Sequence, residues 1–557
     1  MKKEFIFSIF KGLIILIVLN LAATYLFKRF DLTEDKRYTI SEEAIQLISS
    51  FDSPVIIDVL LEGNLPAEFS KLQIETTLLL KQFASKNKNI KFALADPLEG
   101  NTSREQTIAE LQQIGLTPAN VIIEEEGKVS QELVFPWAMV NYKNKTVRVS
   151  LLKNKLGSST TEDRINNSVQ QLEYAFADAF TKLAVKEKKK VAVLKGNGEL
   201  DDLYITDYLS AIRDYYNIGA ITLDSVATNP QSVLDQLKSF DLALIAKPTE
   251  AFNDAEKYVL DQYIASGGKS IWLLDPVAMQ LDSLFNENGN SIALKRQLNL
   301  DDFFFKYGVR LNPVLVNDLY NTPIVLANGE ADESQYNPLP WVYHPMVFSK
   351  NNHPINKNIE AVRLQFASAI DTLSNAYSKT ILLQSSPLSK PEGTPRPISL
   401  NSINNPPEKE KYLKKGNLPL AVLIEGKFKS AYANRIKPIA LKNNIDTEKE
   451  NSLLIISDGD LIKNQLRQGS PLPLGYDKWT NTSYGNKEFL INSINYMLDH
   501  TGLINIRNKK VTIPLLDVQK IANQKTKWQA INIGAPIVLI LIIGISFSYR
   551  RKKKFAA

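Results

Sequence analysis

Polar side chains follow three apolar runs of the chain, at points where a buried strand would end. The three stretches are "KVAVLKGNGE" (190–199), "KSIWLLDP" (269–276) and "SLLIISDGD" (452–460). In an open parallel sheet the carboxyl ends of the strands share one edge, and ligands usually bind there. The sequence therefore offers six candidate contacts for a cation, a sugar, a peptide or a protein partner: Asn197, Gly198, Glu199, Asp275, Asp458 and Asp460. The alternative is a local role, because Asp and Asn also favour turns and helix N-caps.

Two glycine-containing stretches resemble phosphate-binding loops but lack what such loops need. In "SGGKS" (266–270), Tyr263 stands where a P-loop requires its first glycine, and the stretch follows a predicted helix instead of opening one. The turn "GNGELDD" (196–202) has only two glycines, and its carboxylates would repel a phosphate. The chain is therefore not expected to be an ATPase itself.

The residue types of the chain give little support to nucleophilic catalysis or to metal binding. The chain has no cysteine, which excludes disulfides, thiolate metal sites and a cysteine nucleophile. It has no G-x-S-x-G turn to present a serine nucleophile. Its three histidines, His344, His353 and His500, do not adjoin the predicted strand ends. A carboxylate pair remains the one open route to acid–base catalysis, and we expect no catalytic residue, no metal site and no cofactor.

Composition points to a globular protein of several domains. The 557 residues are 44% hydrophobic and 23% charged, with a net charge of +6. Much of the positive charge lies in two short runs, at 186–190 and 550–554. No basic groove interleaved with aromatic residues is evident, so nucleic acid is not an expected partner.

Both ends of the chain carry apolar stretches long enough to span a membrane. The N-terminal stretch covers 5–27 and the C-terminal stretch covers 531–549. Five basic residues follow the second stretch, which predicts a cytoplasmic C-terminus. Two spans then place both termini in the cytoplasm, and the chain between them on the far side of the cytoplasmic membrane. A cleaved signal peptide is the alternative for 5–27, and a buried core helix is the alternative for either stretch.

The chain between these stretches reads as two α/β domains. Residues 31–185 alternate strands and helices and end in a long helix. Residues 186–502 repeat the alternation, which predicts a doubly wound parallel sheet. Within them, the proline- and asparagine-rich range of about 310–450 is expected to be an insertion containing a mobile loop. Residues 503–530 are expected to lead back to the membrane.

Several stretches resemble a known family along nearly the whole chain. They are "RFDLTEDKRYTIS" (29–41), "LKGNGELDD" (194–202), "GGKSIWLLDPV" (267–277), "LIISDGDLIKNQ" (454–465) and "GYDKWTNTSYGNKEFLINSINYMLDHTGLINIRNKKV" (475–511). Together they are similar to the GldG family of gliding-motility-associated ABC transporter components. The resemblance implies an auxiliary membrane subunit that works with a separate permease and a separate ATPase. It also implies a flavodoxin-like second domain, similar to class I glutamine amidotransferases without their activity and to a module of intraflagellar transport proteins.

One departure from the family bears on chemistry. Related sequences often have histidine at the position of Asn197. Unlike histidine, the asparagine side chain cannot act as an acid or base near neutral pH. The sequence therefore predicts a non-catalytic, twice-anchored subunit that binds a partner or a ligand outside the cytoplasmic membrane. The alternative is an envelope glycan-binding protein or hydrolase that uses the acidic strand ends. A solute receptor for import is a third hypothesis, but no internal repeat suggests the two similar lobes that it needs.

Overall fold

The computed structural model describes most of the chain between residue 39 and residue 555. The described residues are 39–63, 65–99, 103–125, 128–153, 160–185, 187–328, 335–349, 351–405, 407–446, 449–498, 502–506 and 518–555, together with 12, 14 and 16–18. Two compact units are present, Met1–Lys510 and Val511–Ala557. The predicted α/β class is confirmed, because the first unit combines helices with several sheets.

The part of the first unit that was predicted to be the first α/β domain, and keeps that name below, is built on a four-stranded mixed sheet. Its spatial order is β2 (Ile90–Leu94), β1 (Val55–Val59), β5 (Trp137–Tyr142) and β6 (Lys145–Ser150). β1 is parallel to β2 and antiparallel to β5. Alternate residues of β1 and β5 are buried, as expected for strands with one face on a core.

Three helices cover one face of this sheet, namely α2 (Glu42–Ser49), α3 (Ala67–Lys86) and α5 (Thr161–Ala184). The Ser41 and Thr160 side chains accept hydrogen bonds from the first turns of α2 and α5, so both helices start at capped positions. Phe51, Phe83 and Phe180 meet edge to face in the core. Each fully buried phenylalanine contributes roughly 2–3 kcal/mol.

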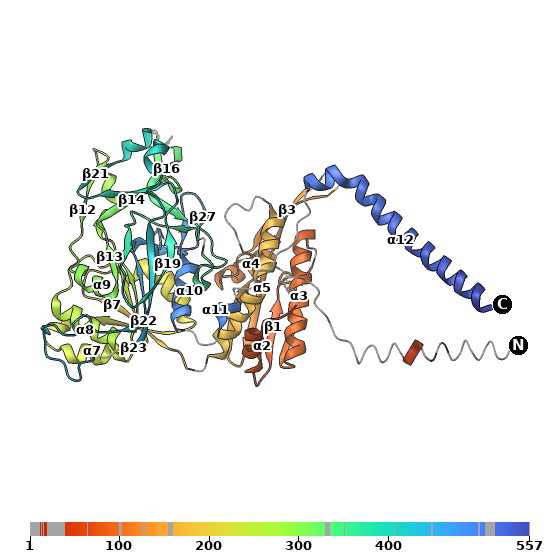
Figure 1. Ribbon diagram of the computed structural model, residues 1–557, viewed down its shortest axis with the longest axis horizontal. Helices are drawn as coiled ribbons and strands as arrows, with labels where there is room; N and C mark the ends of the chain where they lie inside the picture. Colours follow the sequence, from red (N-terminus) through yellow and green to blue (C-terminus); the bar gives the residue numbers. More distant parts are fainter. Residues whose placement is uncertain are drawn as a thin grey trace. The chain divides into compact units, whose positions relative to one another are not determined.

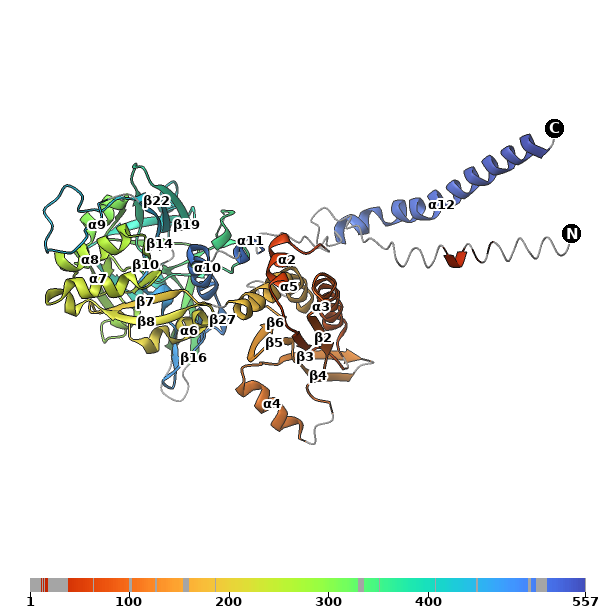
Figure 2. The same ribbon diagram turned by 90° about the horizontal axis from the view of Figure 1, so that it is seen from below.

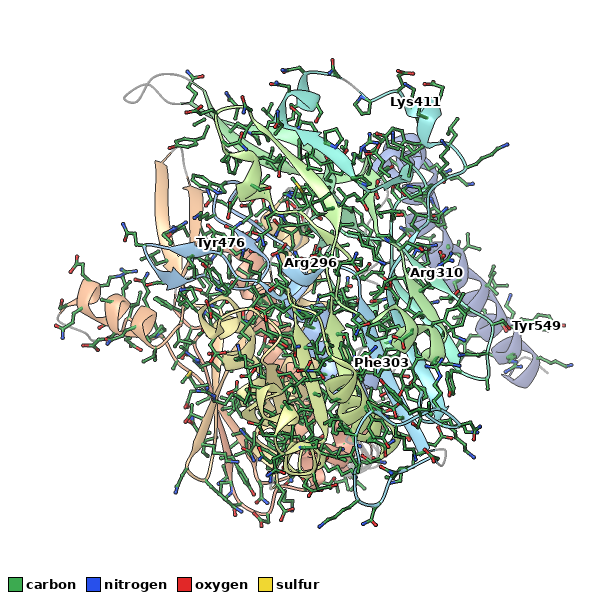
Figure 3. All side chains as sticks on the ribbon, turned by 90° about the vertical axis from the view of Figure 1, so that its left-hand side faces the viewer. Arg296, Phe303, Arg310, Lys411, Tyr476 and Tyr549 are labelled. Atoms are coloured by element: carbon green, nitrogen blue, oxygen red, sulfur yellow. The ribbon has the colours of Figure 1, made fainter. Side chains whose placement is uncertain are left out.

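A helix and a hairpin of this domain stand outside the sheet. α4 (Arg104–Gln113) has no buried residue, and Figure 2 shows it on the side of the sheet opposite α3 and α5. The strands β3 (Ala119–Glu125) and β4 (Lys128–Val134) pair with each other as a separate two-stranded sheet.

The second α/β domain is built on a seven-stranded sheet. Its spatial order is β19 (Ser378–Gln384), β22 (Pro419–Phe428), β23 (Lys449–Ile456), β10 (Lys269–Leu273), β9 (Leu242–Ala246), β7 (Lys190–Lys195) and β8 (Asn217–Thr222). The last five strands are parallel. When these five strands are numbered by their order in the chain, their positions in the sheet from β8 to β23 are 2-1-3-4-5. This order is found in doubly wound sheets.

Helices lie on both faces of the seven-stranded sheet. Figures 1 and 2 show α7 (Pro230–Lys238) and α8 (Asp254–Ala265) on one side of it and α10 (Asn486–Leu498) on the other. Successive residues of β7 alternate between two hydrophobic cores, with Val191 in one and Ala192 in the other. β7 and β9 are therefore continuous apolar runs, as strands buried on both faces must be.

The range expected to be an insertion contributes directly to the sheet. β22 pairs with β23 along eight residues, and β19 pairs with β22, both antiparallel. The proline-rich stretch expected to be a mobile loop also forms strands, β20 (Ser389–Gly393) and β21 (Arg396–Ser399). β20 pairs with β14 (Val314–Asp318), and β21 pairs with β12 (Asn290–Lys295). Pro391 and Pro397 fit there because these small sheets place them on edge strands.

A direct polar contact joins the two α/β domains. Asp178 of α5 accepts a hydrogen bond from the Tyr215 hydroxyl, and Lys182 of the same helix lies 3.8 Å from Asp214. The short helix α11 (Leu503–Ile506) contacts α2, α5 and α10, so residues of both domains surround it.

The second compact unit contains one long helix, α12 (Val518–Phe555). Its part from Gln524 to Lys553 is long and apolar enough to cross a membrane, and its apolar side chains are exposed. The helix extends beyond the predicted span of 531–549 at both ends. It contains Pro536, which removes one hydrogen bond from the helix ladder. Of the predicted N-terminal span of 5–27, only residues 12, 14 and 16–18 are described; the rest of that prediction lies outside the described residues.

Candidate ligand site at the carboxyl edge of the sheet

The six candidate residues lie at the carboxyl ends of parallel strands but form two separate groups. Asp275, Asp458 and Asp460 follow β10 and β23 and come together around Lys247, which follows β9. Asn197, Gly198 and Glu199 follow β7 instead. Asn197 and Gly198 contact the loop at 249–250, Asn197 also contacts the start of α8, and Glu199 accepts a hydrogen bond from Asn197 N. Candidates from different strands therefore come together only in the first group, since the second group follows β7 alone.

Lys247 is the centre of the first group, the acidic cluster of Asp275, Asp458 and Asp460. Its Nζ atom lies 2.5 Å from Asp460 Oδ1 and 3.4 Å from Asp275 Oδ2. Its side chain is only 2% exposed. The backbone of Lys247 is left-handed, with φ at 55°, a conformation that a residue with a side chain rarely adopts. Gly459 makes room for this lysine, since a Cβ atom there would lie 2.5 Å from Lys247 Cγ.

Backbone N–H groups hold the carboxylates of the cluster. Gly459 N donates to Asp275 Oδ1 at 2.6 Å. Asp460 N donates to Asp458 Oδ1 at 2.8 Å, and Gln365 N donates to Asp458 Oδ2 at 2.6 Å. Asp458 thereby caps the short 3₁₀ helix Gly459–Ile462. The local role that Asp residues often have in turns is therefore present here.

Burial sets the protonation of the cluster. It raises the pKa of Asp458 well above the usual value, and the neighbouring charges of Asp460 and Asp275 add to this effect. Burial also raises the pKa of Asp275, although Lys247 opposes it. For Lys247, burial lowers the pKa, but the carboxylates of Asp275 and Asp460 outweigh it and the pKa is raised. Burial and the neighbouring carboxylates therefore favour the neutral form of Asp458, whereas the carboxylates favour the charged form of Lys247.

The turn after β7 is closed by the chain itself. The Asn197 carbonyl accepts hydrogen bonds from Thr249 N and Glu250 N, and Thr249 Oγ1 donates to the Gly198 carbonyl at 2.9 Å. Gly198 has φ at 70°, and a Cβ atom there would lie 2.2 Å from Thr249 Oγ1. The crevice between β7 and β9, where strand order reverses and ligands usually bind, is therefore occupied by residues 249–250.

The Asn197 side chain of this turn also faces α8. Asn197 Nδ2 donates to Glu256 Oε2 at 3.1 Å, and Glu256 forms a capping box with Asn253 at the start of α8. Glu199 Oε2 accepts a hydrogen bond from Asn197 N. Burial raises the pKa of Glu199. Among the described residues, the buried atoms Asn197 Oδ1 and Glu199 Oε1 have no hydrogen-bond partner.

One cleft of about 430 Å³ opens next to the acidic cluster. Of the six candidates, only Asp460 lines it, together with Tyr204, Arg363, Gln365, Lys463 and Trp479. The Trp479 side chain is 54% exposed. Lys463 Nζ lies 5.1 Å above the Tyr204 ring and 3.9 Å from Asp460 Oδ1. The cleft thus combines aromatic faces, amides and charges of both signs, which suits a polar ligand or a protein surface.

Sequence reasoning missed the cations and the aromatic residue of this region. Lys247 had a readable signal, because a lysine directly after the buried run "LALIA" (242–246) is unusual. Arg363 and Trp479 had none, because they lie far from the strand ends in sequence and reach the cleft only through the fold.

The histidines take no part in either group. His344 is fully buried, and neither of its ring nitrogens has a hydrogen-bond partner among the described residues. Burial and the charge of Arg363 hold the pKa of His344 well below its usual value. His353 caps a short 3₁₀ helix through Nδ1. His500 lies outside the described residues. In the part of the chain that the structure describes, no group of three or more His, Cys, Asp or Glu side chains is arranged so that it could hold a metal ion.

The doubly wound sheet and the apolar helix α12 are compatible with a protein associated with a membrane, and comparison with known families gives its class. Residues 188–493, more than half of the chain, match the family described as an ABC-type uncharacterized transport system. The chain belongs to this family and is an auxiliary component of an ABC transport system. Residues 34–141 match a domain family of unknown function.

Two individual proteins show more distant similarity. A protein of Borreliella burgdorferi, described as uncharacterized, is 22% identical over 538 residues, which is 94% of each chain. The solved N-terminal domain of mmIFT52 aligns with 56% of this chain and 98% of its own length, with a TM-score of 0.33 and 12% identity.

Proposed function

We propose that the chain is a non-catalytic auxiliary membrane subunit of an ABC transporter complex linked to gliding motility. Its folded part binds partner proteins or a ligand outside the cytoplasmic membrane. A permease and a separate ATPase are its partners inside the complex. Family membership supports the transport role, and the resemblance to gliding-motility components supports the link to gliding.

One observation carries the non-catalytic part of the proposal. The acids at the carboxyl edge are already engaged, because Lys247 and backbone N–H groups hold Asp275, Asp458 and Asp460. A general acid or base must instead reach the substrate within hydrogen-bond distance. Of these three carboxyl groups only Asp460 lines a cleft, and it is paired with Lys247.

The basic end of α12 supports an orientation. Arg550, Arg551, Lys552 and Lys553 close the helix, and a further lysine follows at 554. Basic residues next to a membrane helix favour the cytoplasmic side. With the N-terminal stretch as a second span, the bulk of the chain lies in the periplasm. Gly534, Ala535, Pro536 and Gly544 then offer close contact points for permease helices.

The cleft also gives some support to the alternative, an envelope glycan-binding protein or hydrolase. Trp479 is an exposed aromatic face beside Asp460 and Asp477. However, Asp477 lies 3.7 Å from Arg363 and accepts hydrogen bonds from Gln465 and Thr480. If the chain were a hydrolase, Asp460→Asn and Asp477→Asn would each lower its activity by roughly 10²-fold or more while the chain stayed folded.

Co-purification tests the proposed function. The tagged full-length chain is extracted in a mild detergent, and recovered proteins are quantified by mass spectrometry. Stoichiometric recovery of a multi-span permease and a soluble ATPase is expected. Recovery of neither protein, from membranes shown to contain both, would contradict the proposal. In a host that glides, deletion of the gene is expected to abolish gliding on a surface.

A further inference from the structure

A groove of about 640 Å³ lies in the first α/β domain, away from the carboxyl edge of the seven-stranded sheet. Its walls come from β4, from α4 and from the segments that follow β1 and β2. Six apolar side chains that line it, called here the floor of the groove, are Leu60, Leu65, Leu98, Ile108, Leu133 and Val134. Most of these side chains are only half-buried, so the protein itself does not cover them.

α4 is an incompletely packed wall of this groove. None of its ten residues is fully buried, and Ile108 is half-buried on the side that lines the groove. A helix in a globular domain normally buries an apolar stripe. The unfilled space beside Ile108 is therefore a place where a second apolar surface would be stabilised.

The rim of the groove is acidic. Four carboxylates line it, from Glu62, Asp96, Glu105 and Glu132, against one cation, Arg104. None of the ion pairs found among the described residues includes any of these four carboxylates. A net negative rim around an apolar floor complements a ligand that carries both apolar and positively charged groups.

The edge of β4 provides backbone hydrogen-bonding capacity at the same place. β3 pairs with one edge of β4, and no strand of the described residues pairs with the other edge. Glu132, Leu133 and Val134 of β4 line the groove. An unpaired strand edge accepts an extended peptide as an added strand, whose alternate side chains then face one surface.

We propose that this groove binds an extended segment of a partner protein in which apolar side chains alternate with Lys or Arg. The apolar side chains pack on the floor, the cations face the acidic rim, and the segment pairs with β4. This proposal rests on the proposed function, because that function includes the binding of a partner protein outside the membrane. It assigns such a contact to the first α/β domain.

A peptide-binding measurement tests the groove without any transporter partner. The full chain is placed in nanodiscs of phosphatidylcholine, a neutral lipid, with empty nanodiscs as the blank. Three fluorescein-labelled decapeptides are titrated and followed by anisotropy, with residues alternating as Lys/Val, Glu/Val or Lys/Ser. The Lys/Val peptide is expected to bind at least about tenfold more tightly than the other two. Its binding is expected to slow amide exchange at 132–134.

Charge reversal gives the matched control. The double variant Glu62→Lys/Glu132→Lys is expected to weaken binding of the Lys/Val peptide by about tenfold and to gain affinity for the Glu/Val peptide. Glu110→Lys, on the same helix α4 but outside the groove, is expected to leave binding unchanged. A gain for the Glu/Val peptide also shows that the double variant is folded.

Three results would each overturn the groove proposal: equal binding of the Lys/Val and Glu/Val peptides, Lys/Val binding no stronger than to empty nanodiscs, or binding that the double reversal does not change. Because no permease or ATPase is present, each of these results would leave the proposed transporter role to its own test.

Discussion

Lys247 Nζ lies 2.5 Å from Asp460 Oδ1, and both side chains are more than nine-tenths buried at the carboxyl edge of the seven-stranded sheet. Lys247 Nζ also lies 3.4 Å from Asp275 Oδ2. The carboxyl ends of β9, β10 and β23, next to the crevice where a doubly wound protein usually receives its ligand, are thus joined by the protein's own ion pairs. This relationship gives the edge a structural role that can be measured.

Removal of the lysine is expected to destabilise the domain strongly. Lys247→Met would leave Asp275 and Asp460 as buried carboxylates without their cation, and such a loss costs about 3–5 kcal/mol. The thermal midpoint of the full chain in neutral nanodiscs, followed by fluorescence of buried Trp272 and Trp341, measures the effect.

Lys195→Met is the matched control, because Lys195 also ends a parallel strand. Its partner Asp202 is largely exposed, so the change is expected to cost no more than about 1 kcal/mol. Equal midpoints for the two variants would contradict the structural role of the Lys247 cluster.

His344 is expected to make stability fall under mildly acidic conditions. Burial and Arg363 hold the pKa of His344 well below its ordinary value. The unfolded chain takes up the proton near about pH 6.5 while the folded chain does not. The stabilisation is therefore full above that pH and is lost as pH falls, by up to about 1.4 kcal/mol per pH unit.

His344→Phe removes this titration, so the stability of the variant relative to the parent chain is expected to rise as pH falls from 7 to 5. Midpoints measured for both chains across this range check the effect. If the stability difference between the two chains did not change with pH, His344 would not be the source of the pH dependence.

The turn after β7 is expected to depend on glycine at position 198. In Gly198→Ala, a Cβ atom would lie 2.2 Å from Thr249 Oγ1, and φ at 70° adds strain. The expected cost is about 1–3 kcal/mol. Amide exchange of Thr249 and Glu250, whose N–H groups bond to Asn197, would become faster.

Gly393→Ala serves as the comparison, since nothing lies within 4 Å of a Cβ atom there. Amide exchange at 249–250 is expected to be faster in Gly198→Ala than in Gly393→Ala. Equally slow exchange in the two variants would contradict the role of the contact between the turn and the loop in closing the crevice.

The absence of cysteine makes the proposed orientation directly testable. A single cysteine at Ile436, which is 95% exposed, is expected to react with a membrane-impermeant maleimide added outside the cytoplasmic membrane of spheroplasts. A single cysteine at Ala557 is expected to react only after the membrane is opened. The reverse pattern would place the bulk of the chain in the cytoplasm.

The sequence predicted the convergence of Asp275, Asp458 and Asp460, because carboxyl ends of parallel strands share an edge whatever their distance in the chain. It did not predict that Asn197 would face α8 instead, since that choice depends on the loop at 249–250. β22 was missed as a strand of the main sheet because pairing across a long intervening segment leaves no local signal. The candidate roles of the six residues in binding remain predictions.

The proline-rich stretch illustrates a second limit of sequence reasoning. Composition there favours a loop, yet β20 and β21 are strands because β14 and β12 supply hydrogen-bonding partners from elsewhere in the chain. Proline is tolerated on such edges, and only the tertiary structure reveals that these edges exist.

Native mass spectrometry of the tagged full-length chain, released from nanodiscs prepared directly from membranes, tests the auxiliary-subunit role most directly. The dominant species is expected to have the summed mass of this chain, a permease and an ATPase. A matched sample lacking 518–555 is expected to lose the permease. A dominant species with the mass of this chain alone, from membranes that contain the other two proteins, would contradict the proposed role.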